Sequence, residues 1–186
     1  MGKYKLAAFD MDGTLLNSGK QISDTTKEMI RRAAKEGKII ALSTGRGLAE
    51  LYEYLDQVPE VRYLDCTSGA MVYDCHEKKV IARRAIAVPH MKKILEIARQ
   101  KDVMIHFLST RSIVQKSKLE EMEDYYMGVY KPMFETVADQ CEDIYQFYMD
   151  HPVPMEKCNI YHHTTEQRAI TEERIKASEL PVVMVN

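Results

Sequence analysis

The feature that most constrains the fold is an apolar run near the N-terminus that ends in Asp10-Met11-Asp12-Gly13-Thr14-Leu15-Leu16. The short run Tyr4–Phe9 before it predicts a strand buried on both faces of a parallel sheet. In such sheets, ligands bind beyond the carboxyl ends of the strands. Because side chains at i and i+2 of an extended chain point the same way, Asp10 and Asp12 are expected to face one site. An Asp-Gly hairpin turn is the alternative, but it does not account for the second carboxylate.

Two carboxylates held this close repel each other, which raises the pKa of one of them unless a cation lies between them. Hard oxygen ligands favour Mg²⁺, which proteins commonly hold with one or two carboxylates, phosphate oxygens and water. We therefore predict a magnesium site that includes Asp10 and Asp12.

Residues 1–81 alternate between predicted strands and helices. Ser23 caps a helix that ends at Gly37, and two further strands are expected near residues 38–42 and 63–66. The strand-helix-strand order predicts a parallel sheet with right-handed crossovers. Residues 68–82 read as a hairpin whose polar tip rises out of the sheet.

The character of the chain changes over residues 82–186. An edge strand is expected at 83–87, followed by a helix that begins at Pro89. The remaining expected elements are strands at 103–108, 157–161 and 181–185, a helical stretch at 115–150, and a helix capped by Thr164 or Thr165.

The string from Asp10 to Leu16 resembles the first motif of the haloacid dehalogenase-like (HAD) hydrolase superfamily. Ser43-Thr44-Gly45-Arg46 resembles its second motif, in the form typical of the Cof-type subfamily. The resemblance implies an α/β fold: a three-layer Rossmann-like parallel core, incomplete here, with an inserted α+β cap. On this reading, residues 1–81 are the N-terminal part of the core and residues 82–186 are a C2-type cap.

The resemblance also implies chemistry, with Asp10 attacking phosphorus to form an aspartyl-phosphate and Asp12 acting as acid and then base. The acid role requires a raised pKa for Asp12. Magnesium would bind the carboxylate of Asp10 and the backbone carbonyl of Asp12. Phosphate would contact Asp12, Gly13, Thr44 and Gly45.

Arg46 and Ser68 are expected to contact the substrate. For Thr44 the alternative is a helix N-cap, and for Arg46 it is a solvated arginine on a first helical turn. Ser68 stands where the Cof-type branch usually carries asparagine, so its side chain reaches less far.

Two further family motifs, a basic residue and an acidic pair, find no match, so the chain resembles the front part of a longer hydrolase. The exposed edge of its incomplete sheet would then invite association into a homo-oligomer. A net charge of −2 argues against a nucleic-acid partner held by charge. No apolar stretch is long enough to span a membrane, and a cytoplasmic protein with four free cysteines is expected.

The leading hypothesis is a magnesium-dependent phosphatase acting on small phosphorylated metabolites and impaired in this short chain. The alternative is a non-catalytic fragment or phosphate-binding protein that keeps the pocket without turnover. A phosphomutase is a third hypothesis, for which the sequence offers no sign of a bisphosphate activator.

Overall fold

The computed structural model describes residues 4–185. The chain divides into two compact units, the first ending at Arg84 and the second beginning at Ala85. The predicted boundary after residue 81 falls inside a strand, so the division comes three residues later. The assignment of these units to core and cap stays a prediction.

The first unit is built on a five-stranded sheet in which the strands follow one another in chain order. The first three strands are parallel and the last two are antiparallel. The strands are β1 (Leu6–Asp10), β2 (Ile39–Ser43), β3 (Val61–Cys66), β4 (Met71–Asp74) and β5 (Lys79–Arg83). The helices are α1 (Asp24–Lys35), α2 (Tyr52–Gln57) and the 3-10 turns Leu48–Glu50 and Thr67–Gly69.

Helix α1 has the predicted ends. The Ser23 hydroxyl accepts a hydrogen bond from the backbone N–H of Thr26, which satisfies a donor that the helix itself leaves unpaired. Gly37 follows the helix at φ +81°, a left-handed conformation that glycine adopts without steric cost. Both local predictions are confirmed.

One face of this sheet carries most of the apolar core. Ile40, Leu42 and Leu64 are fully buried in a cluster that includes Ile30 of α1. The opposite face starts with Leu6 and Ile39, which keep 50% and 40% of their surface exposed. The prediction that the first strand is buried on both faces is therefore wrong, because the side chains of Leu6, Ala8 and Asp10 on this face are exposed in the described residues.

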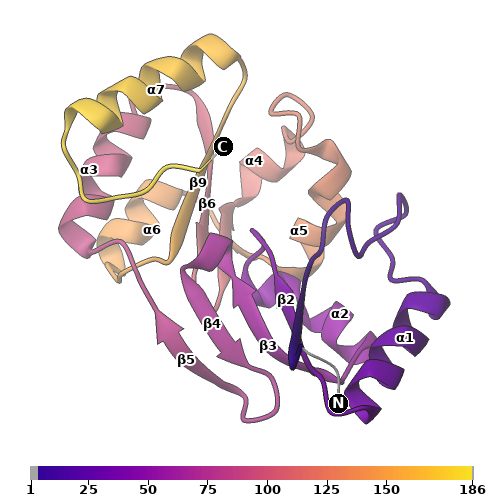
Figure 1. The fold of residues 1–186 in the computed structure, drawn as a ribbon. Helices are drawn as coiled ribbons and strands as arrows, with labels where there is room; N and C mark the ends of the chain where they lie inside the picture. The colour runs from indigo at the N-terminus through magenta and orange to yellow at the C-terminus, as the bar shows by residue number, and fades with distance from the viewer. Residues whose placement is uncertain (1–3, 186) are drawn as a thin grey trace. The chain divides into compact units, whose positions relative to one another are not determined.

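The hairpin β4–β5 does not rise out of the sheet. It pairs with β3 and continues the sheet on the side away from β1, as Figure 1 shows. Backbone pairing satisfies more hydrogen-bonding groups in this position than an unsupported hairpin would. The predicted strand over 83–87 is also wrong, since only Arg83 lies in β5 and Ile86 makes an isolated bridge to Met155.

The second unit has a four-stranded sheet in the order β8-β7-β6-β9, with β6 antiparallel to both of its neighbours. Its strands are β6 (Val103–Leu108), β7 (Ser112–Gln115), β8 (Asp139–Cys141) and β9 (Lys157–His162). Its helices are α3 (Val88–Ala98), α4 (Lys116–Glu120), α5 (Lys131–Val137), α6 (Ile144–Asp150) and α7 (Thr165–Ala177), with the 3-10 turn Gly128–Tyr130.

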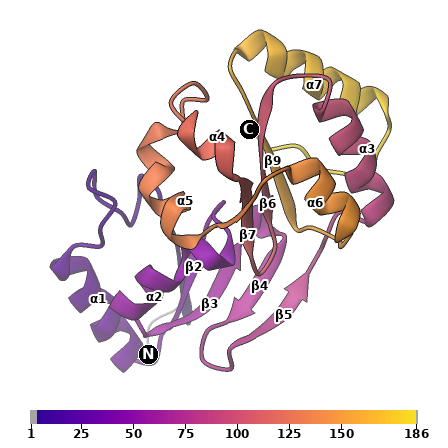
Figure 2. The same cartoon turned by 180° about the vertical axis from the view of Figure 1, so that it is seen from behind.

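Helices cover both faces of this second sheet. Val103, Ile105 and Phe107 pack with α3, α6 and α7, whereas Met104 packs with α4 and α5. Figure 2 shows the two groups of helices on opposite sides of β6. All six residues of β6 are consequently buried.

Two predictions for the second half fail. Residues 181–185 form no strand: Val183 is 89% exposed and no strand of the sheet pairs with the segment. Strands β7 and β8 were not predicted, because each is four residues long or shorter; β8 lies within the stretch 115–150 that was read as helical, and β7 leads directly into it. Among the described residues, no helix has the length and apolar character that crossing a membrane requires.

Candidate active site

The carboxyl ends of β1, β2 and β3 bring three polar side chains into one row. Asp10 is the register partner of Ser43, and Ser43 is the register partner of Asp65. Register partners on neighbouring strands point to the same face, so the three side chains share one face of the sheet. The hydroxyl of Ser43 donates a hydrogen bond of 2.9 Å to Asp65 Oδ2. Asp65 thus holds Ser43 in the middle of the row.

A pocket of about 360 Å³ opens at this end of the sheet. Its lining includes four residues that the sequence predicts for the site: Asp10, Thr44, Gly45 and Ser68. It adds Asp65, which was missed, together with Ser43 from the second motif and Gly69, the neighbour of Ser68. Asp65 is the last but one residue of β3, so a search for acidic residues near the carboxyl ends of strands would have found it.

Asp10 presents an exposed carboxylate at the pocket, and the hydroxyl of Thr14 donates a hydrogen bond of 3.0 Å to its Oδ2. The chain reverses directly after it, with the amides of Leu15 and Leu16 donating to the carbonyl of Met11 at 3.0 and 2.9 Å. Gly13 lies in this reversal at φ +82°, which explains the glycine of the motif.

Asp12 lies beyond the strand end, and its carboxylate is held by two cations. Arg46 donates from Nε to Oδ2 and from Nη2 to Oδ1, each at 2.8 Å, and Lys20 Nζ donates to Oδ1 at 2.8 Å. These contacts, with the Arg46 hydrogen bonds foremost, lower the pKa of Asp12 to about 2. The prediction of a raised pKa is wrong for this arrangement, because these two cations stabilise the ionised carboxylate.

The two motif carboxylates therefore have separate partners. Asp10 is the last residue of β1, so the alternation of an extended chain no longer applies at Asp12. Arg46 forms an ion pair with Asp12, and its contact with substrate stays a prediction. No sequence signal pointed to Lys20, which reaches Asp12 only because the loop between them folds back.

Thr44 is 7% exposed, and its hydroxyl accepts a hydrogen bond of 3.2 Å from the backbone N–H of Arg46. The alternative role as a helix N-cap is wrong, because the next helical turn begins at Leu48 and Gly47 occupies the cap position. Within the pocket, Thr44 and Gly45 contribute the wall next to Asp10.

The loop after β3 is strained and tied to the second motif. Thr67, Ser68 and Gly69 all have positive φ, at 52°, 58° and 85°. Left-handed backbone costs a residue other than glycine about 1–2 kcal/mol. The amide of Thr67 donates to the carbonyl of Arg46 at 2.8 Å, and that of Ser68 to the carbonyl of Thr44 at 3.1 Å. These bonds hold Ser68 and Gly69 at the pocket.

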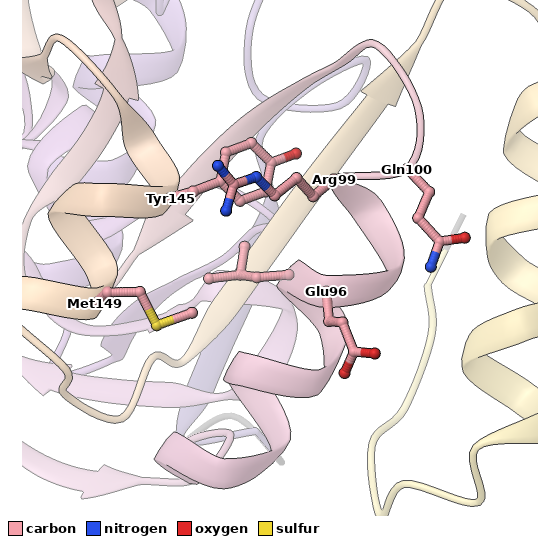
Figure 3. A pocket seen from close by; sticks show the side chains of 6 residues that line it. Glu96, Arg99, Gln100, Tyr145 and Met149 are labelled. Atoms are coloured by element: carbon pink, nitrogen blue, oxygen red, sulfur yellow. The ribbon is translucent and has the colours of Figure 1, made fainter.

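A second cavity of about 350 Å³ lies in the other unit, between α3 and α6 (Figure 3). The guanidinium of Arg99 lies over the ring of Tyr145, 5.4 Å from its centroid, and Met149 adds apolar surface. Within the described residues, its lining has a single carboxylate, that of Glu96, and no serine or threonine hydroxyl of the kind that lies near Asp10. The chemistry of the motifs is at the first pocket.

The donor set at the first pocket fits Mg²⁺ only in part. The exposed carboxylate of Asp10 is a suitable hard ligand, whereas that of Asp12 is engaged by Arg46 and Lys20. Within residues 4–185, no three acidic, histidine or cysteine side chains gather closely enough to hold a metal ion by themselves. The four cysteines are free thiols, as predicted.

The sequence profile of the haloacid dehalogenase-like hydrolases matches residues 7–180, which includes every residue that lines the pocket at Asp10. The chain belongs to the haloacid dehalogenase-like hydrolase family. This confirms the family that the first motif predicts.

Among curated relatives, the chain is 28% identical over 113 residues to a putative phosphatase, YxeH, of Bacillus subtilis. It is 30% identical over 117 residues to the 5-amino-6-(5-phospho-D-ribitylamino)uracil phosphatase YcsE of the same species. The aligned regions cover 59% and 63% of this chain but 42% and 46% of the relatives. The chain therefore matches less than half the length of these two proteins.

Solved structures agree on the fold. A haloacid dehalogenase-like hydrolase from Bacteroides thetaiotaomicron superposes with a TM-score of 0.77 at 21% identity, covering 93% of this chain and 63% of that one. One from B. subtilis superposes with a TM-score of 0.76 at 19% identity, covering 94% and 67%. At these identities the likeness establishes the α/β fold alone, and that prediction is confirmed.

Proposed function

We propose that the chain carries the phosphate-binding and nucleophile-bearing part of a magnesium-dependent phosphatase for small phosphorylated metabolites. The observation that carries the proposal is the exposed carboxylate of Asp10 at a pocket that Ser43, Thr44 and Ser68 also line. A carboxylate beside hydroxyl and amide donors suits attack on a phosphate ester, since the donors bind the phosphoryl oxygens. The phosphatase names of the curated relatives support the same reaction class.

In the proposed first step, an oxygen of Asp10 forms a bond to phosphorus while the bond to the ester oxygen breaks. Asp12 gives its proton to the departing oxygen, and an aspartyl-phosphate remains. In the second step, Asp12 takes a proton from water, which attacks phosphorus and releases phosphate and free Asp10. The ionised Asp12 of this structure suits the second step. The first step requires a bound phosphate that competes with Asp12 for Arg46.

Magnesium, held by the Asp10 carboxylate and the Asp12 backbone carbonyl, would supply positive charge to the phosphoryl oxygens. Gly13 and Gly45 leave room for backbone amides to approach the phosphate, and Ser68 closes the side of the pocket. We assign the unit that ends at Arg84 to the family's core and the unit that begins at Ala85 to its cap. The cap would select the leaving group and limit the access of water.

The direct test is hydrolysis of p-nitrophenyl phosphate with and without added Mg²⁺. We expect turnover that EDTA abolishes and that Asp10→Asn removes, because an amide does not attack phosphorus. Asp24→Asn is the matched control, since Asp24 is fully exposed at the start of α1. Undiminished turnover in Asp10→Asn would overturn the nucleophile assignment.

A second candidate function is phosphate binding without turnover. Two observations favour it: Asp12 is held in its ionised form by Arg46 and Lys20, and the described residues supply an incomplete acidic donor set. Calorimetry with inorganic phosphate, combined with the p-nitrophenyl phosphate assay, separates the two functions. Phosphate binding that depends on Thr44, in a protein that does not hydrolyse the ester, would establish the second.

We also propose that β1 mediates self-association. It is an edge strand with Leu6 half exposed and Ala8 exposed, and unpaired strand edges readily accept another strand. Analytical ultracentrifugation tests this. Ala8→Lys, which places a charge on the edge, is expected to shift the protein to monomer, and an unchanged sedimentation profile would contradict it.

A further inference from the structure

Tyr54 contacts both of the residues that hold Asp12. It belongs to α2 and is 8% exposed. Its ring lies beneath the guanidinium of Arg46, with Cζ 5.3 Å from the ring centroid, and Arg46 Nη1 lies 3.5 Å from its hydroxyl. The same hydroxyl donates a hydrogen bond of 3.2 Å to the carbonyl of Lys20. One side chain therefore supports two separate cations.

The guanidinium of Arg46 contacts both Asp12 and Tyr54, with different atoms. Nε and Nη2 form the pair of hydrogen bonds to Asp12, while Nη1 and the face of the group lie against Tyr54. A bidentate pair gives orientation only while the guanidinium plane is fixed, and a ring packed against that plane fixes it. The side chain of Arg46 is 9% exposed, so little room is left for it to turn aside.

Lys20 depends on Tyr54 through its backbone. Lys20 has φ 58°, a left-handed conformation that a lysine adopts only when its surroundings hold it. The hydroxyl of Tyr54 anchors its carbonyl, and the amide of Lys20 donates to the carbonyl of Asn17 at 2.9 Å. This anchored turn directs Nζ to Asp12 Oδ1.

We propose that Tyr54 is a positioning residue for the reaction assigned above: it fixes the carboxylate of Asp12 by bracing Arg46 and the turn at Lys20. This rests on the proposed function, because Asp12 is the proton donor and acceptor of that mechanism. Tyr54 does not line the pocket at Asp10, so it acts through these two residues and is not itself catalytic. Proton transfer requires a fixed distance and direction between donor and acceptor, so holding the Asp12 carboxylate in place supports this step.

The test compares Tyr54→Leu, which removes ring and hydroxyl, with Tyr54→Phe, which keeps the ring. Tyr52→Leu is the matched control, because Tyr52 lies on the same helix and is 48% exposed, whereas Tyr54 is 8% exposed. The first readout is NMR of the Arg46 Nε–Hε group, assigned by its loss in Arg46→Lys. We expect a slowly exchanging signal in the wild type and Tyr52→Leu, a weaker one in Tyr54→Phe and none in Tyr54→Leu.

The second readout is the rate of ester cleavage in the first turnover, measured by rapid mixing with two phosphate esters, because the later attack of water uses Asp12 whichever ester is supplied. The alkoxide of an alkyl phosphate is a poor leaving group that needs a proton from Asp12, whereas p-nitrophenolate leaves without one. We expect the first-turnover rate for the alkyl ester to fall about tenfold in Tyr54→Leu and about threefold in Tyr54→Phe, with the first-turnover rate for p-nitrophenyl phosphate within about twofold of wild type. Equal losses with both esters would indicate a general structural effect and overturn the proposal.

The phosphatase function and the positioning role of Tyr54 can be tested separately. A wild-type protein that hydrolyses neither ester contradicts the proposed function, while the Arg46 NMR signal still decides whether Tyr54 braces Asp12. An unchanged signal in Tyr54→Leu, or the same loss in Tyr52→Leu, overturns the brace even if the enzyme is active. If Tyr54→Leu does not fold, as circular dichroism would show, the Tyr54→Phe comparison decides.

Discussion

Arg46 donates two hydrogen bonds to the carboxylate of Asp12, from Nε to Oδ2 and from Nη2 to Oδ1, each 2.8 Å long. The two residues are 34 positions apart, and each lies just after one of two neighbouring parallel strands. The pair joins the first motif to the second at the carboxyl ends of β1 and β2. It makes the orientation of the proposed acid-base residue depend on the loop that also shapes the phosphate pocket.

Arg46→Lys tests this pair. A lysine keeps the positive charge but replaces the two parallel hydrogen bonds with a single point contact, so the Asp12 carboxylate is free to turn. We expect kcat for an alkyl phosphate to fall about 10- to 100-fold, within the range ascribed to acid-base catalysis. Arg32→Lys, at an exposed position of α1 where Arg32 pairs with Glu36 at 3.4 Å, is the control and should have wild-type kinetics. Equal kinetics for the two variants would show that bidentate geometry is unimportant.

Ser68→Asn is expected to stabilise the first unit by about 0.5–1 kcal/mol. Ser68 has φ 58°, and asparagine adopts left-handed backbone more readily than serine. Its longer amide side chain should also reach into the pocket and change KM. Lys78→Asn is the control, because Lys78 has φ 52° in the β4–β5 turn and does not line the pocket.

Denaturant unfolding should show a similar gain for both asparagine variants, and kinetics should show a change of KM only for Ser68→Asn. A loss of stability in Ser68→Asn alone would mean that the serine side chain makes a contact that offsets the backbone strain.

His106 is expected to make the second unit less stable in mild acid. It is buried between Ser112 Oγ at 2.7 Å and Asn159 Nδ2 at 3.5 Å, and it packs on Phe134. Burial, with Lys157 nearby, lowers the pKa of His106 from 6.5 to about 3. The unfolded chain therefore binds the proton first as the pH falls. The stability contribution of neutral His106 is complete above pH 6.5 and is lost progressively toward pH 3.

Denaturant unfolding at pH 7 and pH 5 measures this effect. His106 should account for a loss of about 2 kcal/mol over that interval, and His106→Gln should remove this part of the pH dependence. His90→Gln, at the start of α3, is the control and should keep the wild-type slope. An unchanged slope in His106→Gln would show that the histidine is not held neutral in the folded protein.

The sequence predicted the elements whose signals are local. The apolar run before Asp10 and the glycine after Asp12 predicted a strand end and a turn, and Ser23 and Gly37 predicted the two ends of α1. These features need no knowledge of distant residues, because a cap or a positive φ is satisfied by the nearest backbone groups. The family and the α/β fold followed from the same motif.

The failures concern residues whose surroundings come from elsewhere in the chain. Apolar character at 181–185 predicted a strand, but a strand also needs a neighbour, and the described sheet does not pair with this segment. The partners of Asp12 come from a folded-back loop and from a second strand end, so no spacing rule led to Lys20 or to the lowered pKa. The pocket role of Asp65 depends on the alignment of β2 with β3.

The most direct test of the central claim is to look for a phosphoryl group on Asp10. The protein is mixed with a phosphate ester and Mg²⁺, quenched in acid within the first turnover and digested, and the peptide containing Asp10 is analysed by mass spectrometry. The account predicts one added phosphoryl group on that peptide in the wild type and none in Asp10→Asn. Steady release of phosphate without any phosphoryl group on the Asp10 peptide would contradict it.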